Sequence, residues 1–184
     1  MRISTLLIAL LTLSPFLIAD DSTSDQTERE RTRRLNAWRA SEQGQAALKE
    51  ITAIDSRLQL RLVLDKDAPG QFDEVADPSS GGKLRITREV LLNEKAFSSA
   101  SVVTDDKGGA AARVRATLTD AGANQMEWVT SRNINHRLAI LFDGKLLMAP
   151  SIRSTIRQSL EINGGAGLSK AEGEKLVAAI QGNK

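Results

Sequence analysis

The side chains that could carry chemistry are few, and the first of them is the single histidine, His136. A histidine acts as a general base only when a nucleophile and an orienting partner lie nearby, and the sequence around it offers neither group. The chain has no cysteine, which excludes disulfides, a cysteine nucleophile and thiolate metal sites. The sequence therefore predicts a protein that is not an enzyme, with His136 as a structural residue at a strand edge.

Acidic side chains gather between residues 65 and 83, a stretch that is also rich in proline, serine and glycine. They are Asp65, Asp67, Asp73, Glu74 and Asp77. Such a cluster could bind calcium, but the D-x-D-x-D-G register of a calcium loop is absent. The stretch is predicted to be a long loop or excursion without a bound metal.

A glycine-rich run, residues 163–167, precedes a helical pattern and invites comparison with a phosphate-binding loop. A P-loop needs Gly-Lys-Ser/Thr in fixed register, whereas here Lys170 follows Ser169. Ser169 and Glu172 instead have the spacing of a helical capping box. Gly164 and its neighbours are therefore predicted to form a loop that leads into the capped start of the next helix, and no cofactor is predicted.

The overall charge and the aromatic content argue against nucleic-acid binding. The formal charge is +2 over 184 residues, and the chain has two Trp, four Phe and no Tyr. Nucleic-acid surfaces need clustered positive charge, and single-stranded partners need aromatic platforms on which bases stack. No nucleic-acid partner is expected.

Residues 1–19 have the pattern of a secretory signal peptide: Arg2, an apolar stretch, a break at Pro15 and a small residue, Ala19. The pattern favours cleavage and predicts a periplasmic or secreted protein. The alternative is an uncleaved signal that anchors the protein in the inner membrane, because residues 3–19 are at the short limit for a membrane span.

Residues 20–57 are predicted to form a polar and charged arm that is partly helical, with residues 22–28 disordered. The arginines of this arm could contact anionic lipid head groups at a membrane surface. The favoured interpretation is a solvated helix in which Glu and Arg pair at helical spacing, because the negative charges of Glu28 and Glu30 reduce the positive potential of the arm. Trp38 is predicted to dock the arm onto the folded domain.

Residues 58–184 are predicted to form one folded domain of strands and helices. Alternating or apolar patterns predict extended segments at residues 58–64, 84–92, 101–104, 111–118 and 160–162. Residues 93–100 are predicted to form a short helix or turn, and residues 105–109 a hairpin turn. In residues 111–118, Arg113 and Arg115 are predicted to face water.

A second helix is predicted to begin at Thr119 or Asp120, either of which can cap it, and to run to about Asn133. Asn135 then lies where a left-handed residue is needed, and asparagine is the usual substitute for glycine there.

The centre of the domain is predicted to be a hairpin in which Asp143-Gly144 separates two apolar runs, Leu138–Phe142 and residues 146–149. Asp-Gly in this position predicts a type I′ turn, which needs positive φ at both central residues. Both arms are almost continuously apolar, so both faces of the hairpin are predicted to be covered. Pro150 cannot donate to a sheet ladder and is predicted to end the second arm.

This stretch resembles the head subdomain of the first periplasmic domain of SecD and the fused SecDF proteins, membrane components of bacterial protein export. The residues that carry the resemblance are Asn135, His136, Arg137, Leu138–Phe142, Asp143, Gly144, Pro150, Ile152 and the segment around Gly164. The resemblance covers residues 84–180. Asn135 stands in place of the usual glycine and Met148 in place of a small residue. The transmembrane helices of the family have no counterpart in this sequence, so proton-coupled activity is not expected of it.

Together with the patterns above, the resemblance predicts an α+β fold, a small antiparallel or mixed sheet of about four to six strands with two main helices packed on it. It implies a non-enzymatic exported binding module that contacts translocating polypeptide or Sec translocon components through exposed strand edges. The alternative is a structural or interaction domain of the cell envelope that reuses the fold without a role in export. An exposed apolar groove would favour the first function, and a uniformly charged surface the second.

Overall fold

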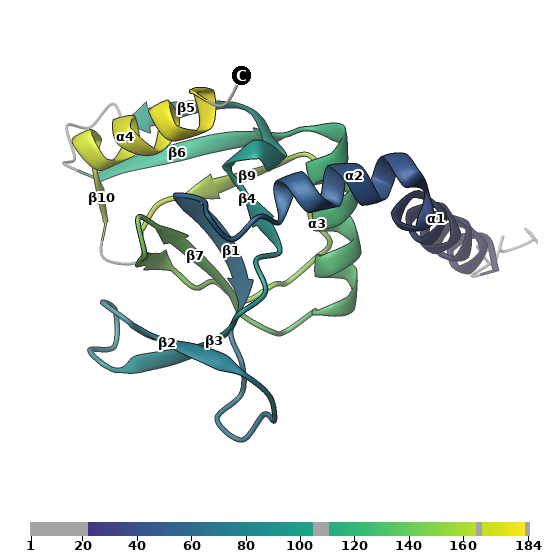
Figure 1. Ribbon diagram of the computed structural model, residues 1–184, viewed down its shortest axis with the longest axis horizontal. Helices are drawn as coiled ribbons and strands as arrows, with labels where there is room; N and C mark the ends of the chain where they lie inside the picture. Colours follow the sequence, from purple (N-terminus) through teal and green to yellow (C-terminus); the bar gives the residue numbers. More distant parts are fainter. Residues whose placement is uncertain (1–21, 105–110, 165–166, 183–184) are drawn as a thin grey trace, which may run out of the picture.

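The structure is a computed structural model that describes residues 22–104, 111–164 and 167–182 (Figure 1). Within these ranges the elements are α1 (Ser22–Ala40), α2 (Glu42–Ile51), β1 (Leu58–Leu62), β2 (Phe72–Ala76), β3 (Lys83–Thr87), β4 (Leu92–Asn93), the 3-10 helix η1 (Glu94–Ala96), β5 (Phe97–Thr104), β6 (Ala111–Leu118), α3 (Asp120–Arg132), β7 (Leu138–Phe142), β8 (Lys145–Met148), β9 (Ser159–Ile162), β10 (Leu168–Ser169) and α4 (Lys170–Gln181). The predicted signal peptide and the predicted turn at residues 105–109 lie outside the described residues.

The described strands are divided over three sheets, and every pairing between them is antiparallel. One sheet has the strand order β4-β1-β7-β8, a second has the order β10-β6-β5 with β9 also beside β6, and β2 and β3 form a separate hairpin. The predicted α+β class is confirmed, although the strands form two sheets and a hairpin rather than one sheet. This division lets β7, which is buried along its whole length, be covered on both faces.

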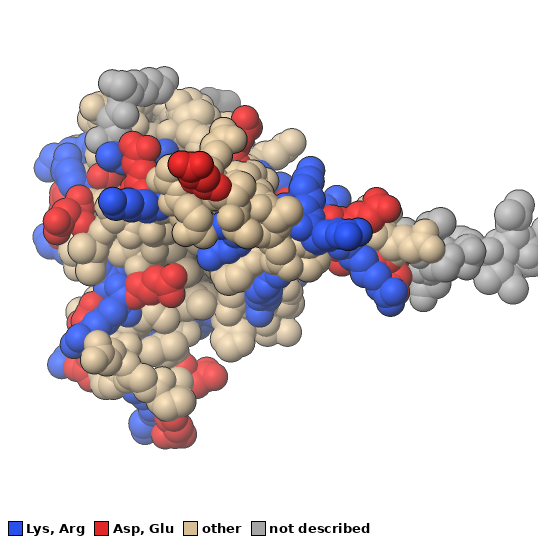
Figure 2. Space-filling view, turned by 45° about the vertical axis from the view of Figure 1, so that its right-hand side comes forward, with Lys and Arg blue, Asp and Glu red and all other residues tan. Residues whose placement is uncertain are grey.

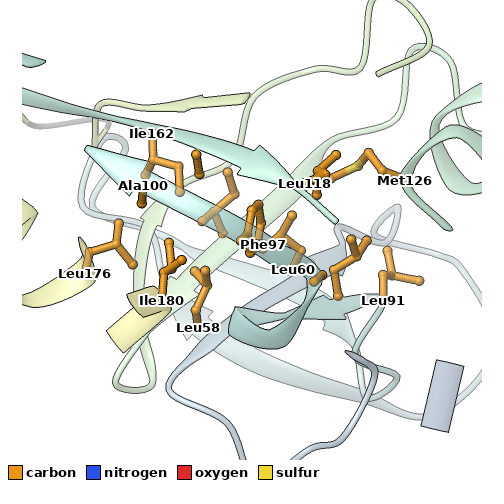
Figure 3. Close-up of a cluster of buried hydrophobic side chains, with 14 of the residues drawn as sticks. Leu58, Leu60, Leu91, Phe97, Ala100, Leu118, Met126, Ile162, Leu176 and Ile180 are labelled. Carbon is orange, nitrogen blue, oxygen red and sulfur yellow. The ribbon is translucent and has the colours of Figure 1, made fainter. Parts of the chain in front are cut away.

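The main core lies between the two larger sheets and the helices. Leu58 and Leu60 of β1 meet Phe97 of β5, and Leu176 and Ile180 of α4 pack beside them (Figure 3). Val114, Ala116 and Leu118 of β6 are also buried, while Arg115 and Thr117 on the opposite face are exposed, as the alternation predicted. The core is almost entirely aliphatic, and burial of these side chains is its main source of stability.

Side-chain caps begin α3 and α4 where the sequence predicted them. The Thr119 hydroxyl accepts a hydrogen bond from Gly122 N, and α3 ends at Arg132 with Asn133 as its C-cap residue. Ser169 and Glu172 form a complete capping box at the start of α4. Asn135 has φ of 70°, so its predicted left-handed conformation is confirmed.

The predicted disorder of residues 22–28 is wrong, because α1 begins at Ser22. Ion pairs at helical spacing join Arg29 to Asp25 and Arg31 to Glu28, and such pairs stabilise a polar helix. The N-terminal part of α1 projects away from the body of the protein (Figure 1).

Two further segment predictions are corrected. Residues 65–83 are not only a loop, because β2 lies within them and pairs with β3 along its full length. The helical part of residues 93–100 is confined to η1, and β5 already begins at Phe97. Asn93 explains this short turn, because its side chain accepts a hydrogen bond from Lys95 N and caps it.

Candidate functional site

The β7–β8 hairpin has the predicted two-residue turn, with φ of 48° at Asp143 and 75° at Gly144. Asp143 is fixed from outside the hairpin by Arg57, whose Nε and Nη2 lie 2.7 and 2.8 Å from the two carboxylate oxygens. The hydrogen bond and the charge of Arg57 hold the pKa of the Asp143 carboxyl below its ordinary value. The turn is therefore tied to the segment just before β1.

The two arms of this hairpin differ in burial. All five residues of β7 are buried, whereas only Leu146 is buried in β8. The prediction that both faces are covered thus holds for β7 but is wrong for β8. The reason is that β8 is an edge strand, with β7 on one side and no further strand of the described ranges on the other.

The second face of β7 is covered by the β2–β3 hairpin. Ile86 of β3 forms a small buried cluster with Ala139 and Leu141 of β7 and with Leu146 of β8. Val75 and Leu84 of the same hairpin pack against this cluster, as do Val63 and Ala149. The cluster lies apart from the main core and places the β2–β3 hairpin beside β7 and β8.

Arg137 and Asp77 make a polar connection between the same two parts. Arg137 Nε donates to the Ala149 carbonyl at 2.9 Å, and its Nη2 lies 3.9 Å from Asp77 Oδ2. Asp77 is buried and accepts hydrogen bonds from Ser79 and Ser80, which together with the charge of Arg137 lower the pKa of its carboxyl. Arg137 thereby connects the β2–β3 turn to Ala149, the residue that follows β8.

A groove of 390 Å³ lies where β2 passes β8. Its lining consists of Glu74, Val75, Ala76 and Pro78 from the β2 side and Gly144, Lys145 and Leu146 from the β8 side. Both strands are edge strands among the described residues, since β2 pairs only with β3 and β8 only with β7. We call this feature the β2–β8 groove; its wall is mainly apolar, and Glu74 and Lys145 supply one charge of each sign.

Two further hollows continue from the groove around Arg137. One of 490 Å³ shares Glu74 with the groove and reaches Arg137, and one of 340 Å³ lies beside Asn135 and His136. His136 is exposed, and its carbonyl accepts a hydrogen bond from Ile152 N. The groove and the hollows offer an extended polar and apolar surface rather than an enclosed pocket.

The predicted signature residues fall into two groups. Asn135, Arg137, Asp143, Gly144 and Pro150 all lie at or next to the β7–β8 hairpin. Gly164 lies elsewhere, in the loop before β10 on the other sheet, with φ of 62°. A side chain there would crowd Leu168 N at 3.2 Å, so Gly164 serves the entry into α4 and not the groove.

Three of the five acidic residues that raised the question of calcium, Asp73, Glu74 and Asp77, form ion pairs. Asp73 contacts Arg61 and Arg88, and Glu74 contacts Lys83. Within the described ranges no group of three or more metal-ligating side chains could hold a metal ion. These carboxylates stabilise the β2–β3 hairpin and its attachment to β1.

The N-terminal arm is held to α3. Leu35 is buried, and Trp38, as predicted, packs against the main core. Arg31 and Arg34 reach Glu127 of α3, a partner that the sequence did not suggest because it lies far along the chain. No helix in the described part of the chain is long and apolar enough to cross a membrane.

The family described as SecDF, P1 head subdomain, matches residues 70–183, which is more than half of the chain. The protein translocase subunit SecD of Leptotrichia buccalis is 40% identical over 79 residues, covering 43% of this chain and 18% of the relative. The same subunit of Acetobacter pasteurianus is 32% identical over 98 residues, covering 53% of this chain and 19% of the relative. The chain thus spans less than a fifth of the length of these two relatives.

Two solved structures are similar in fold. A structure of a membrane component SecDF that enhances protein export has a TM-score of 0.51 and 26% identity, covering 67% of this chain and 61% of that chain. A structure of SecDF in a super-membrane-facing form has a TM-score of 0.50 and 27% identity, covering 67% of this chain and 18% of that chain.

Proposed function

The chain belongs to the SecDF P1 head subdomain family, and from this premise we propose that it is a non-enzymatic, exported binding module that contacts extended polypeptide during protein export. The relatives are translocase subunits, and one solved structure is of a component that enhances protein export. The proposal places the folded domain in the periplasm, where it would meet translocating chains or Sec components.

The observation that carries the proposal is the β2–β8 groove. An extended chain can add to an open strand edge through backbone hydrogen bonds, which makes such binding tolerant of sequence. The groove lies between two edge strands, and its wall of Val75, Ala76, Pro78 and Leu146 suits apolar side chains of a passing polypeptide. An apolar groove favours this function over that of a structural envelope domain.

The test is site-specific photocrosslinking in the native cell. Probes replace Lys145 and Glu74, two exposed residues of the groove, and a matched control probe replaces Lys49, which is exposed on α2. We expect crosslinks from the two groove positions to secreted chains in transit or to Sec subunits, and none from Lys49. Crosslinks to other envelope proteins alone, with export rates unchanged when the gene is deleted, would instead support the structural domain.

A further inference from the structure

Arginines from two distant segments converge on one carboxylate of α3. Arg31 Nε and Arg34 Nη2 of α1 lie 3.0 and 3.8 Å from the carboxylate oxygens of Glu127, and Arg157 Nε lies 3.0 Å from Oε1. The Glu127 side chain is only 6% exposed, whereas that of Arg34 is 68% exposed. One buried carboxylate thus gathers three guanidinium groups whose outer parts face solvent.

Two more arginines lie over the neighbouring residue, Trp128. The guanidinium carbons of Arg39 and Arg132 are 3.8 and 4.5 Å from the centroid of its ring. Asn36 of α1 accepts hydrogen bonds from the Trp128 indole and from Arg132. Cation–π contacts of this kind hold the two arginines in place while leaving them charged.

The positive charge of the protein is concentrated in this region. Helices α1 and α3 and residues 151–158 together contain eight arginines and five carboxylates, a surplus of three, whereas the whole chain carries +2. Figure 2 shows blue side chains along α1 and on the adjoining part of the body, with red side chains among them. The rest of the chain therefore has a small negative balance.

A close-packed corner joins α1 to α2. The Ser41 side chain caps α2 where α1 ends, and Gly44 packs so closely on α1 that an added Cβ would lie 1.9 Å from the Trp38 carbonyl oxygen. Together with the contacts of α1 to Glu127 and Trp128, this packing places the arginines of α1 beside those of α3 and residues 151–158.

We propose that this arginine surface, made of Arg31, Arg34, Arg39, Arg132 and Arg157, binds the surface of an anionic phospholipid bilayer. Guanidinium groups pair well with phosphate, and basic residues near an anionic leaflet each add to membrane binding. A lipid surface fits better than a single small anion because the five arginines come from three segments, α1, α3 and residues 151–158, and a bilayer presents many phosphate groups at once. In Figure 1, α1 leaves the body on the right, whereas β2, one wall of the β2–β8 groove, lies at the lower left, so membrane contact through α1 would leave the groove open.

The test measures binding of the purified full chain to vesicles of phosphatidylcholine alone and of phosphatidylcholine mixed with phosphatidylglycerol. Residues 1–19 are present in both measurements, so the difference in binding between the two kinds of vesicle reports on attraction to the charged lipid. The test variant is Arg34→Gln/Arg132→Gln/Arg157→Gln, with one arginine from each segment. At low salt each arginine near the membrane raises the affinity for an anionic bilayer about fivefold. Because salt screens part of this attraction, we expect the triple variant to bind the anionic vesicles roughly tenfold more weakly or worse.

The matched control is Arg88→Gln/Arg113→Gln/Arg115→Gln, which removes the same charge from other parts of the protein. We expect it to keep binding within about twofold of the unchanged chain, because these positions lie outside the arginine surface. The single variant Arg34→Glu, at an exposed position, repeats the test should the triple variant unfold. The proposal would be overturned if the unchanged chain bound the two vesicle types equally, or if the two triple variants lost the same amount of affinity for the anionic vesicles. Crosslinking at the β2–β8 groove is a separate measurement, so either proposal can fail without the other.

Discussion

Arg57 and Asp143 are 86 residues apart in the chain, yet they are joined by two parallel side-chain contacts of 2.7 and 2.8 Å and by a backbone hydrogen bond from Asp143 N to the Arg57 carbonyl. The guanidinium also lies over the Phe142 ring, 4.8 Å from its centroid. The turn of the β7–β8 hairpin, which borders the groove, is thereby positioned by the segment that precedes β1. We expect protonation of Asp143 to weaken this connection beside the groove.

The Arg57–Asp143 pair is expected to make stability depend on pH below neutrality. The pKa of Asp143 is lowered from its ordinary value of 3.8, so the pair stabilises the folded state above that value. This stability is lost as the pH falls through 3.8 toward the lower pKa of the folded state. Asp143→Asn should be less stable at neutral pH by at most about 1 kcal/mol, because the pair is half exposed.

Urea unfolding measured at several pH values checks this prediction. The stability of Asp143→Asn should fall less steeply with acid than that of the unchanged protein. The control is Asp55→Asn, at an exposed aspartate two residues before Arg57. Its free energy of unfolding should fall with acid as steeply as that of the unchanged protein. Identical slopes for the unchanged protein and Asp143→Asn would contradict the role of the pair.

Two buried helical glycines are expected to respond to alanine in opposite directions. In Gly122→Ala of α3, the new Cβ would lie 2.1 Å from the Ala96 carbonyl oxygen, so the backbone must shift at a cost of about 1–3 kcal/mol or more. In Gly173→Ala of α4, the nearest atoms are side-chain methyl groups 3.5 Å away, and higher helix propensity should raise stability by up to about 1 kcal/mol. Thermal and urea unfolding of both variants distinguish the two cases, and a loss of similar size in both would argue against the close approach at Ala96.

Ile86 is expected to hold the β2–β3 hairpin against β7. The side chain is 1% exposed within the second cluster, so Ile86→Ala should lower the free energy of unfolding by about 2–5 kcal/mol. Ile54→Ala, at a side chain that is 58% exposed, should change it by less than about 0.5 kcal/mol. Hydrogen exchange should show faster exchange in β2 and β3 of the Ile86 variant, and unchanged exchange there would mean that other contacts hold the hairpin.

Glu127 is expected to hold α1 against α3. Glu127→Gln keeps the size of the side chain but leaves three arginines without their buried carboxylate, at a cost of about 1–3 kcal/mol. Limited digestion with trypsin should then cut faster at the arginines of α1. The control Glu28→Gln removes an exposed partner of Arg31 and should cost less than about 0.5 kcal/mol. Equal cutting rates in both variants would show that Leu35 and Trp38 are enough to dock α1.

Local structure was predictable because short-range chemistry determines it. The Asp143-Gly144 turn, the caps at Thr119 and Ser169 and the left-handed Asn135 each depend on a few neighbouring residues. Where local patterns were weak, the predictions failed. The polar start of α1 had no apolar stripe to indicate a helix, and β2 lies in a stretch whose proline, glycine and aspartate content is typical of loops.

By itself, the sequence determined the central hairpin, the helix caps, the solvent-exposed face of β6 and the likeness to the SecD head, because these depend on residue types at short spacing. Only the tertiary structure decided which strands share a sheet, that the β2–β3 hairpin covers β7, and that β8 remains an edge beside the groove. It also brought Arg57 to Asp143 and three arginines to Glu127. These contacts join residues far apart in the chain, and no short-range pattern marks which distant side chain will lie opposite once the apolar faces are buried.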